Sequence, residues 1–201
     1  MTTWIFLRHG QSTANKARVF SGHEDVALTD QGIQQARDAG EAMAEMLRAA
    51  SDLTIASSTL QRARETTRLV LETAGLPQPF QTRDELRERC LGSWQGESID
   101  RLKSSGERDT LLRWDGRPPN GESLLDLAHR VLPCLNEYDN GGTVFIGCHG
   151  GVVRTVAGLG DQMPLEELCR WKVPNCQPIV RTYPQGVWTE ALKNLQPPPA
   201  R

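Results

Sequence analysis

The sequence predicts an α/β fold: a three-layer sandwich in which helices flank a mostly parallel central sheet. Three observations lead to this fold class. Short apolar runs typical of buried strands alternate with longer segments in which apolar residues have helical spacing. Polar or glycine-containing turns follow the clearest apolar runs. The length of 201 residues suits a single domain, which we expect to span residues 1–194, followed by a loose, proline-rich tail at 195–201.

Two pairs of strand and helix are predicted in the amino-terminal part of the chain. Residues 4–7 form a short apolar run with aromatic and β-branched side chains, which stops abruptly at 8–10, as a buried strand does. Residues 29–50 carry apolar side chains at helical spacing. A second strand is predicted over residues 53–56 and a second helix over residues 60–71.

The middle of the chain gives weaker signals. Residues 79–82 are predicted to form a short strand. Residues 84–104 are charged and interrupted by glycines, so we expect a loop with helical turns there. A proline pair followed by Asn-Gly marks a stop at 118–121, and Ser123 with Asp126 matches a capping box that opens the next helix.

The last part of the chain repeats the pattern of the first. Residues 143–147 are predicted to form a buried strand that ends at 148–151, with a helix over residues 152–159 behind it. The segments 173–183 and 187–192, joined by a turn with proline and glycine, are expected to form a terminal hairpin. Ligands of such folds bind beyond the carboxyl ends of parallel strands, so the polar groups after each strand are the candidate site.

The composition limits the classes of partner and cofactor. The formal net charge is −2 and charged residues are spread along the chain, so no nucleic-acid partner is expected. The amino terminus has neither the basic segment nor the apolar length of a signal peptide or membrane anchor, so we expect a cytoplasmic protein with no membrane partner. The five cysteines include no CxxC pair, which argues against a disulfide framework and against a zinc site.

The residues that follow three of the predicted strands share a cationic, donor-rich character and include no carboxylate. Guanidinium forks, imidazole donors and backbone N–H groups near helix starts are the groups that hold a tetrahedral dianion. The pattern therefore predicts a phosphate site. Its members are Arg8 and His9 after the first strand, Ser57, Ser58 and Arg62 after the second, and His149, Gly150 and Gly151 after the last.

Phosphate transfer also requires a nucleophile and a proton donor. Imidazole can attack phosphorus through one nitrogen while a hydrogen bond fixes the other, which gives a phosphohistidine that water can hydrolyse. His9 is the candidate nucleophile. The donor should be a carboxyl group that keeps its proton, which the negative charge of a bound phosphate favours. Glu88, in the charged segment before Gly92, is the candidate donor, and Glu85 is the alternative.

Ordered motifs cover most of the chain, and together they resemble those of the histidine phosphatase, or phosphoglycerate mutase-like, superfamily. An Arg-His-Gly triplet alone is weak evidence, but the order of the motifs leaves little room for coincidence. They are Leu7-Arg8-His9-Gly10-Gln11-Ser12-Thr13-Ala14-Asn15, Phe20-Ser21-Gly22, Leu28-Thr29-Asp30-Gln31-Gly32 with Gln35-Ala36, Ser57-Ser58 with Arg62-Ala63 and Thr66, Leu86-Arg87-Glu88 with Gly92 and Trp94-Gln95-Gly96, Gly121-Glu122-Ser123, and His149-Gly150-Gly151 with Arg154.

The resemblance implies a phosphoglycerate mutase-like sandwich and a role for each matching residue. His9 would be phosphorylated and Glu88 would donate the proton. The resemblance further implies a phosphate pocket, flanking substrate contacts, and neither metal nor cofactor. The implied phosphate-binding residues are Arg8, Asn15, Arg62 and His149, and the implied substrate-binding residues are Ser21, Gly22 and Gly150.

Within the family, the main division is between phosphatases and mutases. The stretch from Gly96 to Pro118 is short, whereas cofactor-dependent mutases of this family typically carry a basic insertion in the middle of the chain. The block at 121–123 is similar to the small-molecule phosphatase branch. We therefore expect a phosphatase that acts on a small phosphorylated metabolite, with phosphoglycerate mutase-type transfer as the alternative. A homodimer is compatible with a free edge of the terminal hairpin.

The sequence is compatible with two further kinds of protein. Cys148 and Arg154 fit the C-x5-R-Thr phosphate loop of cysteine-dependent phosphatases, which would make Cys148 the nucleophile. This interpretation leaves His9 and Glu88 without a role. A non-catalytic protein that binds a phosphoryl ligand would use the same pocket, but such a protein would be expected to have lost one of these two residues.

Overall fold

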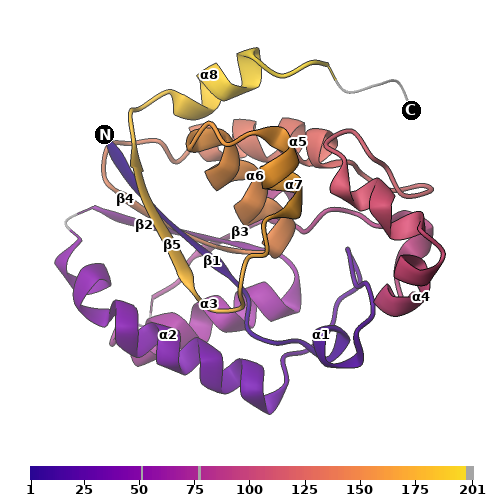
Figure 1. The fold of residues 1–201 in the computed structure, drawn as a ribbon. Helices are drawn as coiled ribbons and strands as arrows, with labels where there is room; N and C mark the ends of the chain where they lie inside the picture. The colour runs from indigo at the N-terminus through magenta and orange to yellow at the C-terminus, as the bar shows by residue number, and fades with distance from the viewer. Residues whose placement is uncertain (51, 77, 198–201) are drawn as a thin grey trace.

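The computed structural model describes residues 1–50, 52–76 and 78–197. Within these residues, five strands form a single sheet with the order β3-β2-β4-β1-β5 (Figure 1). The strands are β1 (Thr2–Arg8), β2 (Leu53–Ser58), β3 (Gln81–Arg83), β4 (Thr143–Cys148) and β5 (Pro178–Tyr183).

The sheet is mostly parallel, as the sequence predicts. β1, β2, β3 and β4 run in the same direction, and only β5 pairs antiparallel, at the edge beside β1. The strand predicted over residues 53–56 continues to Ser58, because Ser57 and Ser58 pair in parallel with Thr82 and Arg83 of β3. The strand therefore delivers these serines to the same end of the sheet as the residues that follow β1 and β4.

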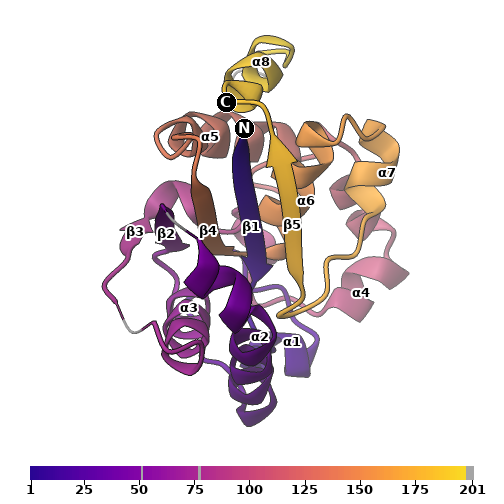
Figure 2. The ribbon, with the colours of Figure 1, turned by 90° about the vertical axis from the view of Figure 1, so that its left-hand side faces the viewer.

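Helices cover both faces of the sheet (Figures 1 and 2). α2 and α3 lie on one face, and α5, α6 and α8 lie on the other, which gives the predicted three layers. The helices are α1 (Thr13–Ala17), α2 (Asp30–Ala49), α3 (Gln61–Thr73), α4 (Ile99–Ser104), α5 (Leu124–Asn136), α6 (Gly150–Gly160), α7 (Leu165–Arg170) and α8 (Val187–Lys193), with short 3-10 helices η1 (Asp84–Leu86), η2 (Gly92–Trp94) and η3 (Glu107–Leu112).

The alternation of side chains along β1 joins the two layers of the core. Trp4 and Phe6 pack with the layer of α5, α6 and α8, whereas Ile5 and Leu7 pack with the layer of α2 and α3. All four side chains are fully buried, because successive residues of a strand point to opposite faces. The strand is thereby held rigidly on both sides, up to the residues that follow its carboxyl end.

The predicted terminal hairpin is wrong. β5 pairs with β1, and residues 187–193 form α8 rather than a second strand. The reason is visible in the packing: Trp188, Ala191 and Leu192 all contact the core and have the i, i+3, i+4 spacing of one helical face. The fully buried Trp188 ring stands edge-on to Trp4 with a centroid distance of 5.3 Å.

The chain after α8 remains close to the core as far as the structure describes it. Leu195 packs against the core, and the carbonyl of Gln196 accepts a hydrogen bond from His129 Nε2 at 2.8 Å. The rest of the predicted tail, residues 198–201, lies outside the described residues. No helix among the described residues combines the length and the apolar character needed to cross a bilayer.

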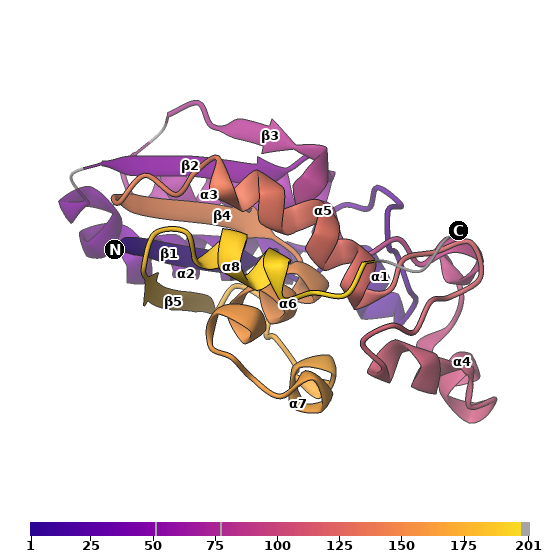
Figure 3. The ribbon, with the colours of Figure 1, turned by 90° about the horizontal axis from the view of Figure 1, so that it is seen from above.

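The segment 88–121 forms a cover beyond the carboxyl end of the parallel strands. Figure 3 shows α4, which belongs to this segment, and α1 on the side of the sheet opposite to the amino terminus. The segment has its own apolar cluster, made by Leu91, Trp94, Leu102 and Leu111 with Phe20 packed against it. Trp94, part of the Trp94-Gln95-Gly96 motif, is therefore a packing residue of this cover.

Candidate active site

Three strand ends bring the predicted phosphate-binding residues together. β4 lies between β1 and β2, and the backbone N–H of His9 donates to the carbonyl of Cys148 at 3.0 Å. His9 and His149, which follow β1 and β4, therefore lie side by side, with ring centroids 5.2 Å apart in an edge-to-face arrangement. Arg62 reaches the same place from the first turn of α3 and is 1% exposed.

A cavity of about 500 Å³ opens at this point. The resemblance assigns a role to nine residues; eight of them line the cavity, and the ninth, His149, is fully buried beside His9. Of the other predicted members of the phosphate site, Gly151 lines the cavity, whereas Ser57 and Ser58 are fully buried and do not. The eight lining residues are Arg8, His9, Asn15, Ser21, Gly22, Arg62, Glu88 and Gly150.

The His9 ring is held in one orientation, with its Nε2 unprotonated and facing Arg62. Its Nδ1 lies 2.7 Å from the carbonyl oxygen of Gly10. A carbonyl only accepts, so Nδ1 carries the proton and Nε2 keeps its lone pair. Consistent with this tautomer, Arg62 Nε donates to His9 Nε2 at 3.3 Å. Burial, followed by the charges of Arg62 and Arg8, lowers the pKa of His9 well below its usual value. The ring is therefore a neutral imidazole at pH 7.

The backbone around His9 is fixed by two side chains. Gly10 N–H donates to Thr66 Oγ1 at 3.0 Å, and Asn175 Nδ2 donates to the carbonyl of His9 at 2.7 Å. Sequence reasoning missed Asn175, because it lies in a turn far along the chain with no motif around it. The two contacts tie the end of β1 to α3 and to the segment before β5.

Arg62 is oriented by backbone carbonyls rather than by a carboxylate. Its Nη2 donates to the carbonyl of Gly22 and its Nη1 to the carbonyl of Glu24, each at 2.8 Å. These bonds also hold the 22–24 turn against the cavity. Arg8 is anchored similarly, through Nη1 to the carbonyl of Val173 at 2.6 Å, whereas its buried Nε has no hydrogen-bond partner among the described residues.

His149 has a buried ring nitrogen that no described residue contacts through a hydrogen bond. Its Nε2 lies 2.8 Å from Ser58 Oγ, and its buried Nδ1 has no partner among the described residues. Burial, and then the charge of Arg62, lowers the pKa of His149 well below its usual value, so this ring is also neutral. A buried polar atom without a partner is costly, and an anion between Arg62 and the two rings would satisfy it.

Glu88 reaches the cavity from the loop between η1 and η2. Its Oε1 accepts from the backbone N–H of Arg89 at 2.8 Å, and its Oε2 accepts from the N–H of Gly151, in the first turn of α6, at 3.0 Å. A Cβ atom at Gly151 would lie 2.0 Å from Oε1, so only glycine leaves room for the carboxylate there. The alternative donor, Glu85, pairs with Arg83 and does not line the cavity.

The loop that carries Glu88 is clamped by two residues that the sequence did not single out. His23 Nε2 donates to the carbonyl of Glu88 at 2.7 Å, and Arg130 Nη2 donates to the same oxygen at 3.2 Å. Arg130 is in turn paired with Glu122, at 2.8 Å between Nη2 and Oε2. Glu122 belongs to the Gly-Glu-Ser motif, which gives this motif a structural role in placing Glu88.

Asn15, which the resemblance assigns to the phosphate pocket, also caps a helix. Its Oδ1 accepts from the backbone N–H of Ser12 at 3.2 Å, which completes a capping box at α1, and from Asn175 Nδ2 at 3.4 Å. The residue also lines the cavity. The carboxamide is therefore both a helix cap and a part of the site wall.

The hypothesis of a cysteine nucleophile has no support in this geometry. Cys148 is fully buried within the apolar core and does not line the cavity. Burial raises the pKa of its thiol, so the thiolate needed for attack is disfavoured. Arg154, the proposed clamp of that loop, donates instead to the carbonyls of Gly150 and Cys169.

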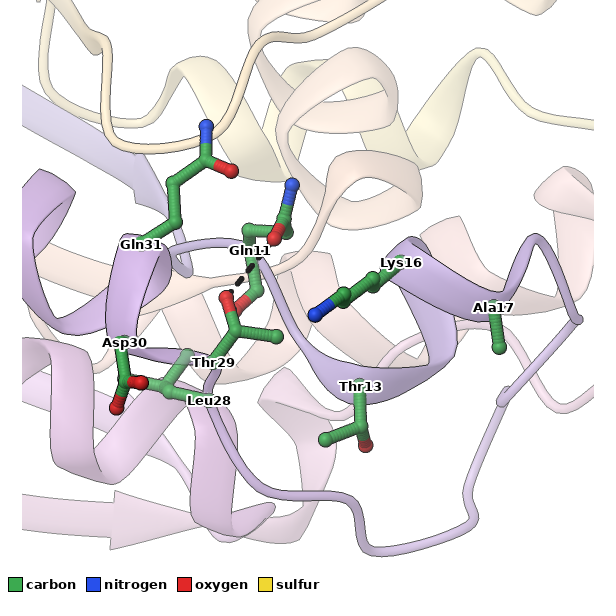
Figure 4. Close-up of a pocket in the computed structure, with 8 residues that line it drawn as sticks. All are labelled: Gln11, Thr13, Lys16, Ala17, Leu28, Thr29, Asp30 and Gln31. Carbon is green, nitrogen blue, oxygen red and sulfur yellow. Dashed lines mark hydrogen bonds between the residues drawn. The ribbon is translucent and has the colours of Figure 1, made fainter.

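The described residues were also searched for a metal site and for a second cavity. No group of three or more His, Cys, Asp or Glu side chains among them gathers where it could hold a metal ion. A second hollow, of about 700 Å³, lies between α1 and the start of α2 and contains none of the residues proposed for the site (Figure 4). There Thr29 Oγ1 donates to Gln11 Oε1 at 2.9 Å, which braces the loop after β1.

Comparisons with known proteins agree on the family. A model of the histidine phosphatase superfamily (branch 1) matches residues 4–196. A phosphoglycerate mutase of Schizosaccharomyces pombe is 37% identical over 180 residues, which cover 82% of this chain and 84% of that protein. The 2,3-bisphosphoglycerate-dependent phosphoglycerate mutase 2 of Gloeobacter violaceus is 31% identical over 96% of this chain and 91% of its own length.

A solved structure shares the fold. A mycobacterial glucosyl-3-phosphoglycerate phosphatase superposes with a TM-score of 0.77 at 25% identity, and the match covers 89% of this chain and 90% of that one. The phosphoglycerate mutase-like sandwich, the ordered motifs and the match along nearly the whole sequence lead to one conclusion. The chain belongs to branch 1 of the histidine phosphatase superfamily.

Proposed function

We propose that this protein is a phosphatase that hydrolyses a phosphomonoester of a small cytoplasmic metabolite through a phosphohistidine at His9, with Glu88 as the proton donor. The observation that carries the proposal is the neutral His9 ring, whose Nε2 faces the Arg62 guanidinium in the cavity that Glu88 also lines. A phosphate dianion in this cavity meets a nucleophile, several fixed cations and a carboxyl group at once.

The proposed reaction has two steps, each with a defined proton transfer. His9 Nε2 attacks phosphorus, the bond from phosphorus to the leaving oxygen breaks, and the carboxyl of Glu88 gives its proton to that oxygen. Arg8, Arg62 and His149 Nδ1 hold the non-bridging oxygens as their charge redistributes. In the second step a water molecule gives a proton to the Glu88 carboxylate and attacks phosphorus, which releases inorganic phosphate and restores His9.

The short segment that covers the site supports phosphate release rather than transfer back to the substrate, because cofactor-dependent mutases of this family typically carry a basic insertion there. The segment 88–121 holds only the short elements η2, α4 and η3 around a small apolar cluster. The mycobacterial structure with the same fold is named as a phosphatase. A second candidate function is phosphoglycerate mutase activity, which is favoured by the relatives at 31% and 37% identity that carry this name.

The two functions are separated by following both products. In EDTA-treated buffer with 3-phosphoglycerate and a catalytic amount of 2,3-bisphosphoglycerate, a phosphatase releases inorganic phosphate, whereas a mutase forms 2-phosphoglycerate. We expect phosphate release from a panel of small phosphomonoesters that includes p-nitrophenyl phosphate, unaffected by EDTA and retained in Cys148→Ala. Formation of 2-phosphoglycerate much faster than phosphate release would assign the mutase function instead.

The lowered pKa of His9 predicts the acid side of the pH profile. An ordinary imidazole becomes protonated below about pH 6.5 and would lose nucleophilicity there. Burial, Arg62 and Arg8 keep His9 neutral at lower pH, so we expect kcat/KM for an aryl phosphate to stay high below this value. The profile should be measured with two aryl phosphates of different phosphate acidity, because a limb set by the substrate moves between them. A limb near pH 6.5 that is the same for both substrates would contradict the prediction.

A further inference from the structure

One short turn at the edge of the cavity holds the start of α3 and the phosphate-binding arginine that this helix carries. The carbonyls of Gly22 and Glu24 accept hydrogen bonds from the two Nη atoms of Arg62, each at 2.8 Å. Asp25 Oδ1 accepts from the backbone N–H of Gln61 at 2.6 Å, which caps a helix whose own N-cap residue makes no side-chain cap. The turn therefore fixes both the guanidinium group and the helix end from which it extends.

The same turn also contacts the loop that carries the proton donor. His23 Nε2 donates to the carbonyl of Glu88 at 2.7 Å, and the backbone N–H of His23 donates to Gln95 Oε1 at 2.8 Å. Gln95 Oε1 also accepts from the backbone N–H of Leu91, at 3.4 Å. A Cβ atom at Gly22 would lie 2.9 Å from the backbone nitrogen of Leu91, so the turn and the loop are closely packed. His23 thus joins the phosphate-binding turn to the loop of the proton donor.

The carbonyl that His23 holds belongs to the peptide unit that places the Glu88 carboxylate. The N–H of that unit, which is the backbone N–H of Arg89, donates to Glu88 Oε1 at 2.8 Å. A trans peptide unit is planar, so its C=O and its N–H point in opposite directions and turn together. A rotation of this carbonyl away from His23 would therefore turn the N–H away from the carboxylate. His23 thus acts on the position of the acid through the backbone.

The second donor to this carbonyl has a broader structural role. Arg130 Nη2 lies 3.2 Å from the oxygen, farther away than His23 Nε2. Arg130 Nη1 also donates to the carbonyls of Glu85 and Arg87, at 2.7 and 3.1 Å. Arg130 therefore holds the whole segment before Arg89 to α5, whereas the ring of His23 acts on a single peptide unit.

His23 does not line the active-site cavity. It lies instead on a neighbouring cavity of about 590 Å³, which Cys90 and Glu122 also line. Burial lowers the pKa of its ring, so the imidazole is neutral at pH 7. Since a carbonyl only accepts, Nε2 carries the ring's proton. The ring can therefore orient the backbone, but it does not contact the reacting atoms.

We propose that His23 is a positioning residue for the proton donor. By holding the peptide between Glu88 and Arg89, it keeps the Glu88 carboxyl beside the leaving oxygen and ties this position to the turn that holds Arg62. The inference rests on the proposed function for the role of Glu88 as the donor, but the placement of the peptide can be measured without turnover.

Three substitutions of His23 separate its hydrogen bond from its bulk. The amide nitrogen of glutamine reaches about as far as Nε2 of histidine, whereas that of asparagine corresponds to Nδ1, and alanine has neither donor. We expect His23→Ala and His23→Asn to lower kcat/KM for propyl phosphate by about tenfold or more, because a small displacement of a catalytic group is costly. The loss for p-nitrophenyl phosphate should stay below about threefold, since its leaving oxygen is stable without a proton. His23→Gln should retain at least about a third of the wild-type value for both substrates.

A double variant and a matched control show whether His23 acts through Glu88. In the Glu88→Gln background, His23→Ala should cause no further loss with propyl phosphate, because two residues that act through the same proton transfer are not additive. His129→Ala is the matched control, because His129 Nε2 also bonds to a backbone carbonyl, that of Gln196, outside the cavity. This control should retain full activity with both substrates.

Amide hydrogen exchange measures the placement of the peptide without turnover. With the Glu88 carbonyl released, the Arg89 amide should exchange about fivefold or more faster in His23→Ala and in His23→Asn. The exchange rate should stay close to that of the wild type in His23→Gln and in His129→Ala. Nuclear magnetic resonance follows this single proton in each variant.

Equal losses for both substrates in His23→Ala, or a further loss beyond that of Glu88→Gln, would assign His23 a general structural role and overturn the proposal. An unchanged exchange rate of the Arg89 amide in the folded variants would overturn it as well. Should His23→Ala fail to fold, the pair His23→Asn and His23→Gln provides the same comparison. Failure of the proposed function has a different sign: no hydrolysis by the wild type, together with faster Arg89 exchange in His23→Asn, would reject the phosphatase and leave the placement of the peptide by His23 standing.

Discussion

His9→Ala should abolish phosphomonoester hydrolysis, with a fall in kcat on the order of 10⁴-fold or more. The variant keeps Arg8, Arg62 and Glu88 but has no nitrogen to attack phosphorus. The loss should therefore appear in kcat, while affinity for inorganic phosphate changes little. Steady-state kinetics with p-nitrophenyl phosphate and calorimetric titration with phosphate measure the two quantities.

His129→Ala provides the matched control for this experiment. His129 lies on α5 and bonds to the carbonyl of Gln196, outside the cavity, so its variant should retain full activity. Rapid quench of the wild type in alkaline SDS, in which the acid-labile phosphohistidine survives, should in addition trap a phosphoryl group on the peptide that contains His9. Substantial activity in His9→Ala, or a trapped phosphoryl group on another residue, would reject His9 as the nucleophile.

Glu88→Gln should slow the reaction by about 10² to 10⁴-fold for alkyl phosphates, because general-acid catalysis typically contributes this much. The effect should be smaller for p-nitrophenyl phosphate, whose leaving oxygen is stable without a proton. The dependence of the loss on leaving group is the specific sign of a proton donor. It is measured as kcat/KM for a series of phosphomonoesters whose leaving groups differ in acidity.

Glu85→Gln is the control for Glu88→Gln. Glu85 lies in the same charged stretch, but it pairs with Arg83 and does not line the cavity. The control variant should lose less than about twofold, because an exposed ion pair contributes little. A loss in Glu88→Gln that is the same for every leaving group would indicate that Glu88 positions the phosphate or the loop rather than donating a proton.

The sequence predicted the part of the site that depends on strand ends. Hydrophobic patterning places a strand before His9 and another before His149, and parallel strands bring their carboxyl ends to one edge of the sheet. Arg62, which the sequence places in the phosphate site, is buried, whereas Arg64 and Arg68 of the same helix are exposed. In each case, local spacing decides where the side chain goes.

The features of the fold and the site that the sequence does not predict depend on contacts between segments that are distant in the chain. The local sequence at 187–192 predicts a strand, but the structure has a helix there, because its core contact through Trp188 depends on Trp4, far away in the chain. Arg89 was overlooked for a similar reason. It follows Glu88 in a charged run that is typical of a solvated surface, whereas the structure buries it in the wall of the cavity.

The close approach of Gly151 to Glu88 matters when other sequences of this superfamily are compared with this one. The carboxylate of Glu88 occupies the volume that a methyl group at position 151 would fill. In this chain, Gly151→Ala would require the flexible Glu88 side chain to move its carboxylate away from this position. The pair of positions, rather than the glutamate alone, is therefore the unit to inspect when activity is inferred from an alignment.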